Sequence, residues 1–279
     1  MTATPAADHL QAHWTRDGAV AILTLDNPPV NVVTYHLTTA LGVALEEIAA
    51  DDSIRVLIVT GAGKRAFCAG SDISEFPDMM KPGQVIDKKL ARQNRIFTRL
   101  ASFPKPTVAA VTGLAYGGGV EIACCCDLIV ADEGAQFCLP ELKLGVFPSS
   151  GGTWRTTRRI GMGRAKEMMF LAEPVDAAKA LDWGLVNRVA SAGAALSTAM
   201  ELARKLVQRP LGAFARCKDL IGASYDAPDG LLLARSLRHS DAAFSSVEAA
   251  EGVRAFFAKE TPDFTKFPVP HCGSDTGFE

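Results

Sequence analysis

The sequence predicts an α/β fold whose last third is helical. Three short and almost wholly apolar runs, at 55–60, 107–113 and 127–131, have the composition of strands that are covered on both faces. Segments with helical periodicity separate these runs, and such alternation is typical of a largely parallel sheet flanked by helices. Beyond about residue 175 strand signals nearly vanish. We therefore expect one α/β core followed by a helical region.

The first elements are a hairpin, a loop and a helix. Residues 13–26 are predicted as two short strands around Asp17-Gly18, a dipeptide that favours tight hairpin turns. The loop NPPVN, at 27–31, then leads to a helix near 36–50, where leucines recur at helical spacing.

The segments between and after the apolar runs are predicted as one loop and several helices. The glycine-containing stretch 61–72 has turn composition, and no helix pattern begins at its second Gly, so a surface loop is favoured over a dinucleotide site. An amphipathic helix at 84–102 ends before Pro104, and a short apolar helix precedes the strand at 127–131. The later helical segments are 151–160, 163–171, 176–183, 192–208, 210–222, 229–240 and 246–258.

Composition excludes several classes of protein. The chain has 279 residues, of which 48% are hydrophobic and 22% charged, and its 29 Lys and Arg against 31 Asp and Glu give a net charge of −2. That balance argues against a surface made for polyanions, and there is no basic run interleaved with aromatics, so no nucleic-acid partner is expected. A globular protein with a real core is predicted.

Cysteine usage and hydropathy bear on compartment and metal. Seven Cys, three of them adjacent at 124–126, form no CxxC pair, so neither a disulfide framework nor a zinc ribbon fits, and the triplet is predicted to pack as small apolar residues. The pair His9 and His13 has no third ligand in sequence reach, so no metal is expected. Glycines and acids interrupt the apolar stretch 107–131, which therefore cannot span a membrane. The N-terminus has no apolar leader pattern, and we expect a cytoplasmic protein.

Three glycines in AYGGGVEIACCCD, 115–127, are the first candidate for chemistry. They lie between a buried strand and a helix start, where backbone can approach a ligand closely and free N–H groups favour negative charge. Glu121 follows Gly118 by one helical turn, so its carboxylate is expected near the same point. Taken alone, Glu121 fits better an acidic first-turn residue that complements the helix dipole.

A second glycine-containing loop and a second carboxylate strengthen this candidate. AFCAGSD, at 66–72, follows the preceding buried strand, and N–H groups from two such loops would form an oxyanion hole. Glu141 lies between Pro140 and an apolar stretch, where burial would raise its pKa and let it carry a proton near neutral pH. Without the other two elements, Glu141 would be taken for an exposed loop acid.

Three motifs in order resemble one known family. AFCAGSDI, GLAYGGGVEIACCCDLIVAD and AQFCLPELKLGVFPSSGGTWR are similar to motifs of the crotonase, or enoyl-CoA hydratase/isomerase, superfamily, and the likeness covers nearly the whole chain. The resemblance implies a crotonase-like β-β-α spiral core at 10–195 and a C-terminal helical trimerisation region at 196–268. It also implies a homotrimer or homohexamer, and we expect disordered tails at 1–9 and 269–279.

The resemblance further implies an acyl-CoA substrate and a set of catalytic groups. The backbone N–H groups of Ser71 and Gly118 would polarise the thioester carbonyl. Glu121 would help a water add to the β-carbon, while Glu141 would exchange the proton at the α-carbon. The implied activity is that of an enoyl-CoA hydratase, a lyase of fatty acid and lipid metabolism that adds water reversibly to a trans-2-enoyl-CoA. No cofactor is implied, since CoA is part of the substrate.

Two further groups of residues follow from the resemblance. CoA contacts are implied at Val30, Lys64, Ala66, Cys68, Asp72, Ile73, Phe256 and Lys259, the last two from the same or a neighbouring subunit. The substrate pocket is expected to involve Phe76, Tyr116, Pro140, Ser149 and Trp154. Either lysine is also consistent with ordinary solvation, and Phe76 and Tyr116 with core or rim packing.

Departures from the family pattern leave alternatives open. Hydratases usually read GAGGT where this chain reads SSGGT at 149–153, and Trp154 stands where Gln is common. Double-bond isomerisation, dehydration of a specialised hydroxyacyl-CoA and thioester hydrolysis therefore remain alternatives. A non-catalytic acyl-CoA-binding or RNA-binding homologue is an alternative of a different class, although the presence of both acids argues against lost catalysis.

Overall fold

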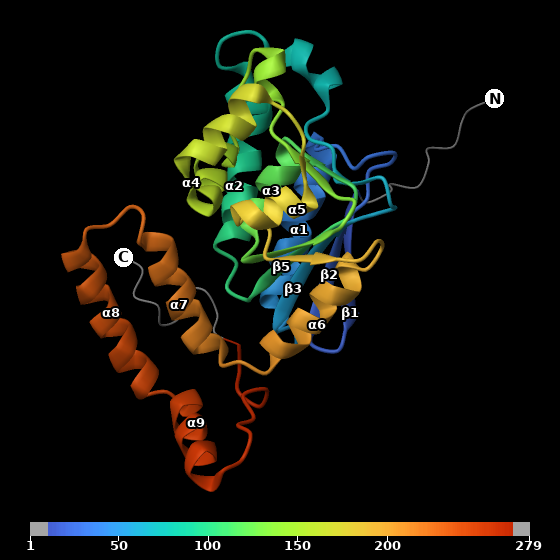
Figure 1. Ribbon diagram of the computed structural model, residues 1–279. Coiled ribbons are helices and arrows are strands. Elements are labelled where there is room, and N and C mark those ends of the chain that lie inside the picture. The colour runs from blue at the N-terminus through green and yellow to red at the C-terminus, as the bar shows by residue number, and fades with distance from the viewer. Residues whose placement is uncertain (1–10, 270–279) are drawn as a thin grey trace.

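A six-stranded sheet forms the centre of the protein. The computed structural model describes residues 11–269, and Figure 1 shows the sheet with helices on both sides of it. The strand order is β1-β2-β3-β5-β7-β10, with β1 antiparallel to β2 and all other neighbours parallel. The strands are β1 (Ala12–Asp17), β2 (Val20–Leu25), β3 (Val56–Gly61), β5 (Thr107–Val111), β7 (Leu128–Asp132) and β10 (Arg188–Ala190). The predicted hairpin and the three predicted buried strands are confirmed.

A second sheet of four very short strands lies beside the first. Its order is β4-β6-β8-β9, and its strands are β4 (Ala66–Cys68), β6 (Leu114–Tyr116), β8 (Gln136–Cys138) and β9 (Val175–Asp176). β3, β5 and β7 are each followed by one of these strands and then by helical structure, which gives a repeated strand–strand–helix unit. The surface loop predicted at 61–72 is wrong in part, because β4 is wholly buried. Strands of two or three residues are too short to show an alternating pattern, and β10 escaped prediction for the same reason.

The predicted helices are present, with local differences. The α-helices are α1 (Tyr35–Ala50), α2 (Ala91–Ala101), α3 (Gly118–Cys125), α4 (Gly152–Leu171), α5 (Ala177–Trp183), α6 (Ala195–Val207), α7 (Leu211–Ala223), α8 (Asp229–Phe244) and α9 (Val247–Ala258). The amphipathic helix predicted at 84–102 begins as a π-helical turn, Ile86–Leu90, that continues into α2. Two helices were predicted where α4 lies, and Gly161 divides α4 with a non-helical φ of 78°. Short 3₁₀ helices cover Ile73–Met79 and Glu141–Leu144.

Alternate residues of the central strands enter two separate hydrophobic clusters. On one face of the sheet, Val56 and Ile58 of β3 belong to a cluster completed by α6. On the other face, Leu57 and Val59 belong to a larger cluster that also contains Leu41 of α1. Because side chains in a strand point alternately to opposite faces, a strand covered on both sides must be apolar at every position. The continuous apolar runs in the sequence follow from this double covering.

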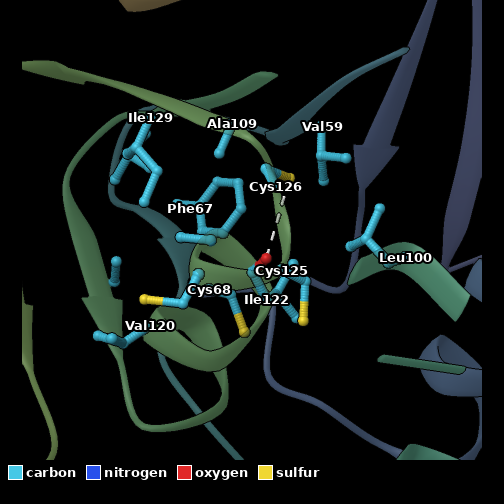
Figure 2. Packing of buried hydrophobic residues seen from close by; sticks show 14 of the residues in the cluster. Val59, Phe67, Cys68, Leu100, Ala109, Val120, Ile122, Cys125, Cys126 and Ile129 are labelled. Carbon is cyan, nitrogen blue, oxygen red and sulfur yellow. Dashed lines mark hydrogen bonds between the residues drawn. The ribbon is translucent and has the colours of Figure 1, made fainter. Parts of the chain in front are cut away.

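The cysteine triplet lies inside the larger cluster. Figure 2 shows Cys125 and Cys126 there with Phe67 of β4, and the Cys126 thiol contacts the carbonyl oxygen of Ile122 at 3.9 Å. Burial raises the pKa of all three thiols of residues 124–126. They are protonated and enclosed at neutral pH, so packing as small apolar residues is confirmed.

Helices α7, α8 and α9, residues 211–258, form a C-terminal arm that projects from the body of the protein (Figure 1). No residue of α8 is buried in this chain. Two ion pairs connect the arm to the body: Arg158 of α4 pairs with Asp226 at 2.7 Å, and Lys218 of α7 pairs with Asp127 at 2.9 Å. The Tyr225 hydroxyl also donates to the carbonyl of Arg158 at 2.9 Å. The arm is therefore attached at a few points and leaves most of its surface open.

The described chain ends close to the limits of the folded elements. The tails expected at 1–9 and 269–279 fall outside the described residues, apart from Val269. Within 11–269, no helix combines the length and the apolar character that crossing a bilayer requires. α6, which opens the region predicted at 196–268, packs on the sheet rather than in the arm.

Candidate active site

The glycine turn between β6 and α3 brings two segments into close contact. Gly117 has a φ of 49°, and its N–H donates to the carbonyl of Cys138 in β8 at 2.8 Å. A Cβ atom on Gly119 would lie 2.0 Å from the carbonyl oxygen of Cys68. Real side chains never approach backbone this closely, so only Gly at position 119 lets the start of α3 lie against β4. The two glycine-containing loops singled out from the sequence are therefore in direct contact.

Two backbone N–H groups face away from their own secondary structure at this contact. Ser71 pairs with Val33 in an isolated parallel bridge, in which the Val33 N–H donates to the Gly70 carbonyl and the Asp72 N–H donates to the Val33 carbonyl. These two hydrogen bonds are made by Gly70 and Asp72, the neighbours of Ser71, so the N–H of Ser71 itself takes no part in the bridge. Gly118 is the first residue of α3, where N–H groups have no acceptor within the helix. Within residues 11–269, neither N–H has a hydrogen-bond acceptor. The position is suited to a ligand oxygen.

Glu121 is held in place by the segment that precedes α4. Its side chain is 3% exposed, and Oε1 accepts hydrogen bonds from the N–H groups of Ser150 at 2.7 Å and Gly152 at 3.0 Å. Burial raises the pKa of this carboxyl, and the two N–H donors oppose that rise only in part. Glu121 is thus more than an acid that complements the dipole of α3, because it joins α3 to the N-terminus of α4.

Glu141 is the second carboxylate, and it is less constrained. It begins the 3₁₀ helix Glu141–Leu144, and its Oε2 is buried without a hydrogen-bond partner among the described residues. Burial raises its pKa to about 7, with a smaller contribution from the charge of Glu121. Both protonation states of Glu141 are therefore populated near neutral pH, as the sequence predicted.

The two carboxylates converge on the glycine turn. A Cβ on Gly117 would lie 3.0 Å from Oε1 of Glu141, and a Cβ on Gly118 would lie 3.9 Å from Oε2 of Glu121. The same two Cβ atoms would lie 3.6 Å and 3.9 Å from backbone atoms of Gly70, the residue before Ser71. Two proton-carrying groups and two free N–H groups therefore surround one small volume.

That volume opens into a cavity of about 390 Å³. Five of the predicted site residues line it: Ser71, Phe76, Glu121, Glu141 and Ser149. Other lining residues were not singled out from the sequence: Met79, Met80, Val85, Lys89, Leu90, Gln93, Leu144, Val146, Phe147 and Ser150. The sequence held one signal for them, since Gln93 is a polar residue on the otherwise apolar buried face of α2. The cavity has apolar walls and a polar end, which suits a ligand with an acyl chain.

Three residues predicted for the pocket do not line this cavity. The Tyr116 hydroxyl bonds to Gln136 at 3.0 Å at the edge of the second sheet. Trp154 is 42% exposed on α4, with the guanidinium of Arg155 over its ring at 5.3 Å. Pro140 caps the 3₁₀ helix that carries Glu141. Tyr116 and Trp154 are thus rim or surface residues in this chain, and Pro140 acts on the site through the backbone.

The residues predicted to contact CoA fall into two groups. Asn31 joins the loop around Val30 to β4, because its buried amide donates to the carbonyl of Ala66 at 2.9 Å. Lys64 and Ile73 are exposed near this junction, and Asp72 caps the 3₁₀ helix after it. Ala66 and Cys68 are buried, so neither residue presents an accessible surface to a ligand in this chain. The second group, Phe256 and Lys259, lies on α9 in the C-terminal arm, far from the glycine turn in Figure 1.

Metal ligation was also assessed across the described chain. Within residues 11–269, no cluster of three or more His, Cys, Asp or Glu side chains is placed to hold a metal ion. His9, one of the two histidines considered from the sequence, lies outside the described residues, and His13 lies 3.9 Å from Asp26.

Fold and site together define an α/β protein of strand–strand–helix units with two buried carboxylates beside a glycine turn. A family model described as enoyl-CoA hydratase/isomerase matches residues 15–267, and the chain belongs to that family, within the crotonase superfamily. Carnitinyl-CoA dehydratase of Salmonella typhi is 36% identical over 260 residues, which are 90% of this chain and 96% of that protein.

Solved structures agree with this assignment. DspI of Pseudomonas aeruginosa has a TM-score of 0.85 at 34% identity, covering 94% of this chain and 99% of that one. An enoyl-CoA hydratase from Bacillus anthracis has a TM-score of 0.86 at 29% identity, covering 92% and 100%. The protein is thus a crotonase-superfamily enzyme, as the motifs predicted.

Proposed function

We propose that the protein is an enoyl-CoA hydratase that adds water reversibly to a trans-2-enoyl-CoA thioester. The observation that carries this proposal is the convergence of Glu121 and Glu141 on the glycine turn, beside the free N–H groups of Ser71 and Gly118. Addition of water to an α,β-unsaturated thioester needs two proton transfers and one site for negative charge. The site holds groups for all three.

The two N–H groups bind the thioester carbonyl oxygen. When water adds to the β-carbon, negative charge moves through the α-carbon onto that oxygen and gives an enolate. Donors that are already aimed at this oxygen stabilise the enolate more than the starting carbonyl, and one such donor contributes about 3 to 4 kcal/mol. The donors are backbone groups, so the side chain at Ser71 does not limit this role.

The two carboxylates divide the proton transfers. Glu121, fixed by Ser150 and Gly152, acts in its carboxylate form and accepts a proton from the water that attacks the β-carbon. Glu141, with a pKa of about 7, gives its proton to the α-carbon. In the reverse direction Glu141 takes the proton back from the α-carbon and Glu121 returns its proton to the leaving hydroxyl, so hydration and dehydration use one arrangement. Each such group typically contributes 10²- to 10⁴-fold in rate.

The names of the relatives support dehydration, the reverse of this reaction, as well as hydration. Proteins that are 36% identical over 90% of this chain carry the name carnitinyl-CoA dehydratase. Loss of water from a hydroxyacyl thioester is the reverse of the reaction above and needs the same two carboxylates.

A spectrophotometric assay with crotonyl-CoA tests the proposed reaction. We expect the absorbance of the conjugated thioester to fall as water adds, and to rise again when 3-hydroxybutyryl-CoA is supplied instead. Both signals require reversible hydration, whereas hydrolysis releases free CoA thiol. Binding of crotonyl-CoA with neither absorbance change would contradict the proposal.

The proposed reaction uses no cofactor besides the CoA carried by the substrate. Every step is a proton transfer or the addition of water, and no electron changes hands, so protein carboxylates and N–H groups suffice. All six described cysteines are free thiols, and five of them are buried. This usage supports a reducing compartment, and we place the enzyme in the cytoplasm.

We further propose that the C-terminal arm assembles the protein into a homotrimer or homohexamer. Large apolar side chains of the arm are exposed, among them Leu233, Leu237 and Phe244 at 62%, 63% and 88%. A hollow of about 770 Å³ on the arm is lined mainly by apolar residues, including Phe244 and Phe264. Surfaces of this kind are typically covered by a partner.

Light scattering after gel filtration measures this assembly. We expect a mass of three or six times the 29.6 kDa chain. Leu237→Glu should reduce the mass to that of smaller species, because a carboxylate would be buried in the interface. Met162→Glu, at an exposed site on α4 outside the arm, is the matched control. A monomeric native protein would rule out the proposed assembly.

A further inference from the structure

Gln93 of α2 places an unsatisfied amide at the polar end of the cavity. Its side chain is 2% exposed, and Nε2 donates to the Ser150 hydroxyl at 2.8 Å. Its Oε1 is buried and has no hydrogen-bond partner among the described residues. Buried carbonyl oxygens are almost always paired, because leaving one unpaired forfeits the hydrogen bonds that it makes in water. Because Gln93 lines the cavity, we take this unpaired oxygen as the acceptor of a hydrogen bond from a ligand.

Lys89 places a cation beside the same part of the cavity. It precedes Gln93 by about one helical turn, is 8% exposed and lines the same cavity. Its ammonium donates to the Val33 carbonyl and to Oε2 of Glu75, each at 3.2 Å. An ammonium has three N–H donors, so one remains for a ligand. The polar end of the cavity thus offers one acceptor and one donor.

We propose that this polar end favours an acyl group bearing a hydroxyl beyond the β-carbon, so that hydroxylated enoyl thioesters bind more tightly than plain hydrocarbon ones. The inference rests on the proposed function and names its substrate class. A hydroxyl both donates and accepts a hydrogen bond, so it can satisfy Oε1 of Gln93 and the remaining N–H of Lys89 together. A hydrocarbon chain would leave both unsatisfied.

Charged acyl groups fit this end less well. A carboxylate would attract Lys89, but it cannot donate to Oε1 of Gln93, and it would lie in the same cavity as the carboxyl groups of Glu121 and Glu141. A quaternary ammonium has no N–H to donate, and the ammonium of Lys89 would repel it. A neutral group that both donates and accepts a hydrogen bond is compatible with Gln93 and with Lys89.

Ser150 fixes where along the acyl chain the hydroxyl lies. The Ser150 N–H donates to Glu121 and the Ser150 hydroxyl accepts from Gln93, so a single residue links the two side chains. Under the proposed mechanism Glu121 acts at the β-carbon. The hydroxyl that we assign to the Gln93 amide is therefore one on the next carbon, the γ-carbon. A 4-hydroxy-2-enoyl thioester is the simplest member of this class.

Calorimetric binding of two ligands tests the inference. The ligands are crotonyl-CoA and 4-hydroxy-trans-2-butenoyl-CoA, which differ by one hydroxyl, and the trans double bond keeps that hydroxyl away from the thioester. Both are titrated into the full-length Glu121→Gln protein, in which hydration is slow enough to leave them intact. We expect the hydroxylated ligand to bind about 10-fold more tightly or better, as for a site whose polar groups it alone satisfies.

Adding Gln93→Met removes the acceptor while keeping an unbranched side chain of similar length. We expect this change to abolish the preference, mainly by weakening the hydroxylated ligand. Asn94→Leu is the matched control, because Asn94 is the next residue of α2 and its amide bonds to the Leu90 carbonyl instead of facing the cavity. It should leave the preference intact. Circular dichroism shows whether each variant is folded, and Gln93→Asn, which shortens the side chain by one carbon, is used if the Met variant is not.

Equal binding of the two ligands to the Glu121→Gln protein would overturn the inference. A preference that survives in the Gln93 variant would overturn it as well, since some other group would then recognise the hydroxyl. Because the readout is binding, it does not depend on turnover. A protein that binds with the expected preference but hydrates neither ligand would refute the proposed function while leaving this recognition standing.

Discussion

Replacing Glu121 with Gln is expected to lower the rate of crotonyl-CoA hydration by about 10²- to 10⁴-fold, because the group that accepts the proton of water is lost. The change is structurally mild. The amide oxygen of Gln can still accept the hydrogen bonds from Ser150 and Gly152, so the link between α3 and α4 is kept. The assay follows loss of the enoyl thioester absorbance.

The same variant separates the two carboxylates. Moving a double bond from the 3- to the 2-position needs only proton exchange at carbon, which is the role assigned to Glu141, so any such isomerase activity should largely survive Glu121→Gln. Glu133→Gln, at an exposed carboxylate, is the matched control and should leave both activities near the native level. An equal loss of hydration and isomerisation in the Glu121 variant would contradict this division.

Replacing Gly119 with Ala is expected to destabilise the protein by about 3 kcal/mol or more, at the upper end of what overpacking costs. The added methyl would lie 2.0 Å from the carbonyl oxygen of Cys68, and both partners are backbone, so α3 and β4 would have to move apart. That movement would displace the N–H of Gly118, so hydration should fall as well. Thermal unfolding and the crotonyl-CoA assay measure the two effects.

Gly134→Ala is the matched control for this substitution. Gly134 also lies in the strand-rich half of the chain, but a Cβ there would have no heavy atom within 4 Å. A surface change of this kind is expected to alter the free energy of unfolding by no more than about 0.5 kcal/mol. Similar melting temperatures for the Gly119 and Gly134 variants would show that α3 and β4 separate easily, contrary to the close contact described above.

The sequence predicted the parts of the fold that have a long, regular pattern. The run at 55–60 is apolar at nearly every position because β3 has helices on both of its faces, and period and composition reveal this directly. β4 has three residues, and its role depends on the distant glycine at position 119, which no local pattern records. Short strands of the second sheet therefore escaped prediction while the first sheet was found.

The candidate site was predictable to the extent that its chemistry lies in motifs. Glu121, Glu141 and the glycine turn stand in recognisable stretches, and the structure brings them together as expected. Lys89 and Gln93 lie in a helix whose sequence shows only amphipathicity, and their relation to the site comes from the packing of α2 against α3. Tyr116 and Trp154 were expected in the pocket from the family resemblance, and tertiary packing places them outside the cavity.

The first half of α4 links the C-terminal arm to the active site. The N–H of Gly152, which holds Glu121, begins this half, and Arg158, which pairs with Asp226 of the arm, lies near its end, before the break at Gly161. This segment therefore contacts the catalytic carboxylate at one end and the arm at the other. Shortening the chain before residue 226 would remove the contact of Asp226 with this segment together with the proposed assembly surface.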